Sequence, residues 1–350
     1  MEILVIIFII LLLYGIKWKG DRRDKIEGIP RQSTAALRGI FSIVIIFSHI
    51  AVRCPQDVGF LFGMWRHLSY SAVGIFFFLS GYCLAWNFRF KLDYMKGFIN
   101  RKIQEILFPY IIVSIIYWTV FNLLGRNITV KDFLFSFVNG NPIASNTWYV
   151  IAIIIYYLFF YIASKIFLRN YDKILIFNIF FVSSLIIIWY LSGYGSHWCN
   201  SNYSFVLGIG YGFYIEYIER ILYRYSVWII TVSGIIFVGG FIIKIITSKY
   251  IESGLFMIIL SEIISSAFTI IVFSIIYKFD IGNKITNFLG HISFQIYMLH
   301  GLFYNILLGL NIKVTAVEFT IITLFASIVV GCFFARIQSW MIKKININLI

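Results

Sequence analysis

The sequence has few charged residues, few prolines and few cysteines, and each shortage excludes a class of protein. Only 13% of the 350 residues are charged, whereas soluble chains carry about 25%. Four prolines and four cysteines are too few for collagen, for a disordered chain or for a disulfide-stabilised scaffold. Hydrophobic residues instead make up 61% of the chain, and its mean hydropathy is +0.90. This composition predicts an all-α helix bundle that crosses a membrane many times.

Eleven stretches are apolar over about the 20 residues that a membrane-spanning helix needs. They start at about Glu2, Ala35, Tyr70, Ile106, Asn146, Ile174, Tyr203, Val227, Gly254, His291 and Ala316. The first stretch is short and its basic residues follow it, which is the reverse of a signal peptide, so we expect a retained anchor. The chain therefore divides into an N-terminal anchor with a basic cytoplasmic linker, residues 1–34, and a ten-helix domain, residues 35–350.

The net charge of +14 is explained by topology and does not indicate a nucleic-acid partner. If the N-terminus lies outside, 22 of the 29 Lys and Arg residues fall in cytoplasmic segments. Since such residues concentrate on the cytoplasmic side, we expect an outer N-terminus, a cytoplasmic C-terminus and a location in the bacterial cytoplasmic membrane.

Ionisable side chains inside an apolar span are candidate functional groups, because burying them in lipid is costly. Arg38 and His49 lie eleven positions apart on the second stretch, and at about 100° per residue they share one helix face with Ser42. At about 1.5 Å per residue, Arg38 lies at the cytoplasmic edge and His49 lies about 16 Å deeper. A snorkelling arginine and a hydrogen-bonded core histidine are the alternative interpretation.

A second polar face contains Ser293, Tyr297, His300 and Tyr304, at spacings of four, three and four residues. It is either part of the same site or a hydrogen-bonded seam between helices. Glu262 is the one acid deep within a span, and it could orient a histidine, pair with a cation or be protonated.

Arg101 and Lys102 precede Phe108-Pro109-Tyr110 at the cytoplasmic end of the fourth stretch. Such a pair can bind phosphate, although it is also typical of a cytoplasmic flank.

Cys54 and Cys199 could pair in outer loops, but four unpaired cysteines are the favoured interpretation. Without a CxxC motif, no metal site is expected. The glycines of the segment Gly208 to Gly212 predict close helix packing.

Five segments in order along the chain resemble the membrane acyltransferase 3 family. They are Arg38-x10-His49, Ser71 to Tyr82, Arg101-Lys102 with Phe108-Pro109-Tyr110, Trp148-Tyr149, and Ile292 to His300. The resemblance implies a ten-helix core that transfers an acetyl or similar acyl group from cytoplasmic acyl-CoA to a hydroxyl of an extracytoplasmic or lipid-linked glycan. It implies functional roles for Arg38 and His49, and contacts from Arg101 and Lys102 to the phosphates of acetyl-CoA. A second arginine that the family has near Gln104 or Glu105 is missing.

The chemistry of such a transfer matches these residues. A thioester-to-hydroxyl transfer needs a general base, for which we choose His49. It also needs a donor for the oxyanion, which Ser42, Tyr297 or His300 could supply. The alternatives are a proton-coupled transporter or flippase, and a glycan-assembly protein without acyl chemistry.

Overall fold

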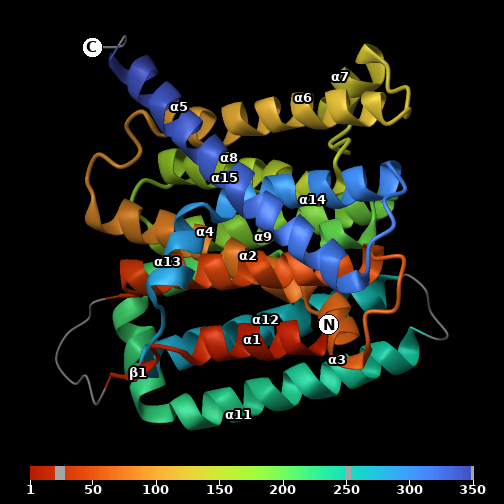
Figure 1. Cartoon of the computed structure of the whole chain (residues 1–350). Helices are drawn as coiled ribbons and strands as arrows, with labels where there is room; N and C mark the ends of the chain where they lie inside the picture. Colours follow the sequence, from red (N-terminus) through yellow and green to blue (C-terminus); the bar gives the residue numbers. More distant parts are fainter. Residues whose placement is uncertain (20–27, 249–253, 348–350) are drawn as a thin grey trace.

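The computed structural model describes residues 1–19, 28–248 and 254–347, and it is almost entirely helical (Figure 1). In chain order the elements are α1 (Glu2–Leu13), β1 (Lys17–Trp18), α2 (Arg31–Arg53), α3 (Phe60–Gly63), η1 (Met64–His67), α4 (Ser69–Phe90), α5 (Phe98–Lys102), η2 (Ile103–Leu107), α6 (Phe108–Leu123), α7 (Val130–Val138), η3 (Ser145–Thr147), α8 (Trp148–Ile166), α9 (Tyr171–Leu191), η4 (Ser196–Cys199), α10 (Tyr203–Phe213), α11 (Ile215–Thr247), α12 (Leu255–Lys278), β2 (Phe279–Asp280), α13 (Lys284–His291), α14 (Ser293–Gly309) and α15 (Ala316–Ile347). The predicted all-α bundle is confirmed.

The described residues contain eight helices long and apolar enough to cross a membrane, or nine if the bent pair of α13 and α14 is one span. This is fewer than the eleven predicted. Two predicted spans form helices that are too short: α1 has 12 residues and α10 has 11. The chain breaks at Tyr214, and α11 then continues for 33 residues from Ile215. The span expected to start at Val227 is therefore the second half of a longer helix.

Helices α2 and α4 form the centre of the bundle. Within their most apolar windows 83% and 78% of the residues are buried, whereas only 6% are buried in the corresponding window of α11. A helix that is apolar on all sides and also buried on all sides belongs to the interior. The predicted active-site helix α2 therefore lies in the core, and α11 lies at the lipid-facing periphery.

Glycines allow the central helices to pack closely. A Cβ atom at Gly208 of α10 would meet the backbone of Phe78 in α4, and one at Gly81 of α4 would meet the backbone of Phe205. Gly39 of α2 and Gly290 of α13 pack against each other's helices in the same way. The close packing predicted for the segment Gly208 to Gly212 is confirmed.

The N-terminal helix α1 packs onto this bundle. The Phe8 ring lies 5.3 Å from the Phe47 ring of α2, centroid to centroid, and a Glu2 carboxylate oxygen accepts a hydrogen bond from the Leu61 backbone N–H. Downstream, β1 pairs antiparallel with β2. The rest of the predicted basic linker, residues 20–27, lies outside the described residues. The division into an anchor and a domain stays a prediction.

The two ends of the bundle hold different elements. In Figure 1, β1 and α13 lie at one end, on the left, and α3 and α7 lie at the other. The predicted cytoplasmic and outer segments are thus separated, although which end faces the cytoplasm stays a prediction. The four cysteines are free thiols, and buried Cys199 donates to the Ile186 carbonyl.

Candidate active site

The structure brings the two predicted intramembrane histidines together. The rings of His49 on α2 and His300 on α14 lie 4.9 Å apart, centroid to centroid, and are nearly perpendicular at 86°. Tyr304 completes the cluster, with its ring 6.1 Å from His300 and 6.4 Å from His49. Two helices separated by about 240 residues of sequence therefore form one site from the two polar faces that the sequence indicated.

His300 has a defined tautomer and an unused nitrogen. Its Nδ1 lies 2.7 Å from the Tyr297 carbonyl and 3.3 Å from the Ile296 carbonyl, and since carbonyls only accept, Nδ1 carries the proton. Its Nε2 is buried and has no hydrogen-bond partner among the described residues. A neutral imidazole with a free lone pair can accept a proton or a hydrogen bond.

A cavity of about 470 Å³ lies between the same helices, and Arg38 of α2 and Tyr297 of α14 are among the residues that line it. Helices α2, α4, α5, α8, α13, α14 and α15 and the π-helical turn η2 line it. Arg38 lines the cavity, and its Nε atom is buried without a hydrogen-bond partner in the described part of the chain. Arg38 as a whole is half-buried, and an anionic ligand in this cavity would pair with its guanidinium.

Lys102 also lines the cavity, but it already has a partner. Its Nζ lies 2.7 Å from a carboxylate oxygen of Glu105, which also lines the cavity. Gln338 donates to the Glu105 backbone carbonyl and accepts a hydrogen bond from Gln295, at 3.1 and 2.7 Å. These side chains tie α14 and α15 to η2 around the cavity.

Arg101 lies apart from the cavity lining. Its guanidinium donates to the backbone carbonyls of Tyr94 and Lys96 and stacks on the Tyr94 ring. Burial raises the pKa of Tyr94 to about 12, so this phenol stays neutral. In this structure, Arg101 holds the loop between α4 and α5.

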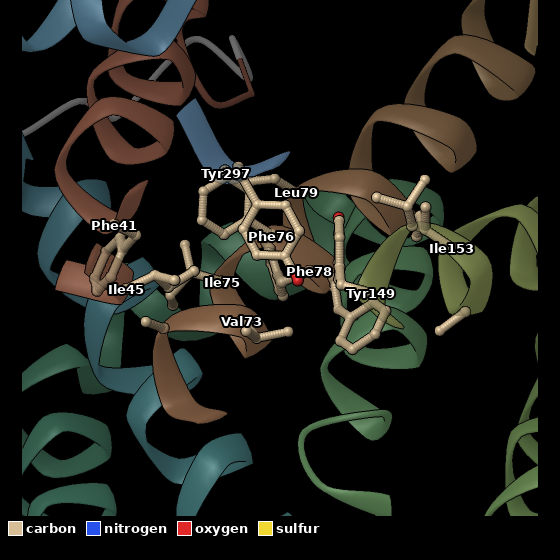
Figure 2. Close-up of a cluster of buried hydrophobic side chains, with 14 of the residues drawn as sticks. Phe41, Ile45, Val73, Ile75, Phe76, Phe78, Leu79, Tyr149, Ile153 and Tyr297 are labelled. Atoms are coloured by element: carbon tan, nitrogen blue, oxygen red, sulfur yellow. The ribbon is translucent and has the colours of Figure 1, made fainter. Parts of the chain in front are cut away.

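An aromatic layer made of Phe76, Tyr149 and Tyr297 lines the cavity, and Tyr297 connects this layer to His300. Tyr297 lines the cavity, and its ring is 5.4 Å from Tyr149, 6.3 Å from Phe76 and 6.0 Å from His300. Figure 2 shows these three rings together in the buried cluster. The cavity therefore ends one helical turn before His300, because Tyr297 precedes it by three residues.

Two other predicted polar residues have structural partners. The Ser42 hydroxyl is fully buried, donates to the Gly39 carbonyl at 2.8 Å and does not line the cavity. Buried Glu262 accepts hydrogen bonds from the backbone N–H groups of Asn202 and Tyr203, at 2.8 and 3.1 Å. Glu262 thus caps the N-terminus of α10, a role not among those that the sequence suggested.

Several cavity residues were not singled out from the sequence. Tyr149 and Gln295 lie within the motifs that carry the family resemblance, which was an available signal. Nothing in the sequence marked Glu105 and Gln338 as cavity residues, because polar residues near helix ends are common in any membrane protein. No group of three His, Cys, Asp or Glu residues in the described ranges could hold a metal ion.

Comparison with known proteins gives one match. A family model described as an acyltransferase domain, Acyl_transf_3, matches residues 34–336, which include Arg38, His49, Tyr297 and His300. No curated protein and no solved structure matches the chain.

Proposed function

The chain belongs to the membrane acyltransferase 3 family, and from this premise we propose which acyl transfer it performs. The donor is acetyl-CoA or another acyl-CoA, bound in the cavity at Arg38 from the cytoplasm. The acceptor is a hydroxyl of an extracytoplasmic or lipid-linked glycan, and the protein works in the bacterial cytoplasmic membrane.

One observation carries this proposal: the helices that hold the His49–His300 pair, α2 and α14, also line a cavity with an arginine that has no carboxylate partner among the described residues. A donor with phosphates at one end and a thioester at the other matches a cation at the mouth and a base further in. Guanidinium groups bind phosphate through paired, charge-assisted hydrogen bonds. Arg38 is therefore the main phosphate ligand, and Lys102 assists it if the Glu105 ion pair opens.

The proposed reaction uses His49 as the general base. His49 is partly exposed and His300 is fully buried, so an acceptor hydroxyl reaches His49 more easily. His49 takes the hydroxyl proton while the oxygen attacks the thioester carbon. The carbon–sulfur bond then breaks, and the leaving thiolate takes the proton from the His49 imidazolium, which restores the neutral base. The free His300 Nε2 accepts a hydrogen bond from the imidazolium of His49 and stabilises it.

Tyr297 is the candidate oxyanion donor that the geometry favours. It lies between the cavity and the histidines, whereas the Ser42 proton is engaged by a carbonyl. The acyl end must pass the aromatic layer to reach His49, so we propose that Tyr297, Phe76 and Tyr149 change rotamer when the donor binds.

The alternative of a proton-coupled transporter or flippase would use the histidines as a proton relay. An arginine on the same helix as His49, without a carboxylate partner among the described residues, favours a bound anionic donor instead. A glycan-assembly protein without acyl chemistry would leave this cation unexplained.

The test is donor binding and turnover by the purified protein in lipid nanodiscs. Radiolabelled acetyl-CoA should bind, and a membrane glycan extract should stimulate both CoA release and incorporation of label into an alkali-labile ester. Malonyl-CoA and succinyl-CoA, supplied separately, identify the acyl group. If no acyl-CoA binds and no CoA is released, the proposal is wrong.

A further inference from the structure

Two adjoining cavities lie on the other side of the bundle, among α9, α11, α12 and η4. One has a volume of about 490 Å³ and the other about 260 Å³, and both are lined by Ile258. They share no lining residue with the donor cavity. Their volumes are of the order of ligand pockets, about 300–1,000 Å³, and the proposed acyl transfer does not use them.

The larger cavity is apolar. Isoleucines of α9, α11 and α12 make up most of its wall. Three of its polar groups already have partners: the carboxylate of Glu262 caps α10, and the hydroxyls of Ser183 and Tyr203 lie 2.7 Å apart in a hydrogen bond. Ser233 and Ser266 add only two hydroxyls to the wall, and a wall made mostly of isoleucine favours an apolar ligand such as a hydrocarbon chain.

The smaller cavity is polar and contains a cation. The Lys244 ammonium donates to the Ser261 hydroxyl at 2.7 Å and lies 3.9 Å above the ring of Tyr70. It has no carboxylate partner among the described residues. Asn200 also lines this cavity; it is only 8% exposed, and its Oδ1 has no donor in the described part of the chain. The described residues therefore offer this cavity no anion for Lys244 and no hydroxyl or N–H group for Asn200 Oδ1.

We propose that the two cavities together bind one amphiphile with a phosphate head. The phosphate pairs with Lys244, a hydroxyl of the head group donates to Asn200, and the hydrocarbon tail fills the apolar cavity between α11 and α12. Basic pockets between membrane helices bind anionic lipid head groups by the same electrostatics. Since α11 lies at the periphery of the bundle, the tail can enter sideways from the bilayer.

The test measures lipid binding to the intact protein in detergent by native mass spectrometry. The probes are phosphatidylglycerol, a polyprenyl phosphate and zwitterionic phosphatidylcholine. Lys244→Gln should weaken binding of the two anionic lipids at least tenfold, whereas Lys244→Arg and the exposed control Lys313→Gln should not. Ser266→Trp, which fills the apolar cavity, should also weaken binding, and Val238→Trp on the outer face of α11 should not.

The competing results are equally specific. Preference for polyprenyl phosphate identifies a lipid-linked ligand, and preference for phosphatidylglycerol identifies a bilayer lipid; both agree with the proposal. Equal binding of phosphatidylcholine, or unchanged binding by both Lys244→Gln and Ser266→Trp, overturns it. Because acyl-CoA binding is measured separately and uses other residues, failure here leaves the proposed function standing.

Discussion

Arg38 is expected to lower the stability of the protein and to bind the acyl-CoA donor. Its Nε is buried without a partner within the described ranges, so replacing it with Met should leave the thermal midpoint Tm unchanged or raise it. The same substitution should weaken acyl-CoA binding at least tenfold, because it removes the main phosphate ligand. Binding by isothermal titration and Tm by differential scanning fluorimetry check the two effects.

Arg89 supplies the matched control for Arg38. It forms a two-pronged ion pair with Glu216, at 2.6 and 2.5 Å, and does not line the donor cavity. Arg89→Met should lower the Tm and leave acyl-CoA affinity unchanged. If Arg38→Met instead destabilises the protein and binds the donor normally, Arg38 is a structural residue.

The contact between His49 and His300 predicts that the losses of kcat on replacing each of them are not additive. His49→Ala should lower kcat by about 10²–10⁴-fold, the usual contribution of a general base. His300→Ala should also lower kcat, through lost support of the His49 imidazolium. If the two act as a unit, the double variant loses little more than His49→Ala alone. CoA release in nanodiscs measures all three, with His67→Ala as a control, and fully multiplicative losses would contradict a coupled pair.

At the scale of elements, the contact between α4 and α10 depends on glycine. A Cβ atom at Gly208 would meet the Phe78 carbonyl oxygen and the Tyr82 nitrogen, and backbone atoms cannot move aside as a side-chain end can. Gly208→Ala should therefore destabilise the protein by about 1–3 kcal/mol or more, seen as a lower Tm and a lower yield of monodisperse protein. Gly234→Ala in α11, which meets nothing within 4 Å, should be tolerated. Equal behaviour of the two variants would contradict this packing role.

The elements that the sequence predicts well are those whose apolar run alone sets their length. Helices α2, α4 and α12 begin close to the predicted starts of their spans. The sequence does not predict that α10 ends after 11 residues, because Tyr214 and Ile215 continue the apolar run and the break there is a matter of tertiary packing. The 76° bend between α13 and α14 lies at Ile292, next to His291, where the predicted span starts. The sequence does not predict that Lys284–His291 forms a further helix before that span.

For the site, periodicity placed Arg38 and His49 on one face and Tyr297 and His300 on another. That these faces meet depends on tertiary packing, which a single sequence does not reveal. For Arg101, the sequence predicted a ligand contact and the structure shows contacts within the protein. Its position suggests phosphate binding, but the loop carbonyls of Tyr94 and Lys96 engage its guanidinium in the structure.

At the scale of the whole molecule, the proposed reaction requires that the acyl donor and the acceptor reach the bundle from opposite sides of the membrane. The Arg38 side of the donor cavity lies toward the end with α13, since Gly290 of α13 lines it, and α3 and α7 lie at the other end (Figure 1). The distribution of Lys and Arg predicts that the α13 end faces the cytoplasm. Donor entry from the cytoplasm and acceptor access from outside both depend on this orientation.

Cysteine accessibility in intact cells tests the orientation. Because Cys54, Cys83, Cys199 and Cys332 are free thiols, replacing them with Ser or Ala breaks no disulfide, and single cysteines can then be introduced. Lys131→Cys on α7 and Lys91→Cys after α4 replace exposed side chains that the orientation places outside and in the cytoplasm, respectively. A membrane-impermeant maleimide should label Lys131→Cys in intact cells, and Lys91→Cys only after permeabilisation. The reverse pattern would put the Arg38 cavity outside, away from cytoplasmic acyl-CoA, and would require a different donor.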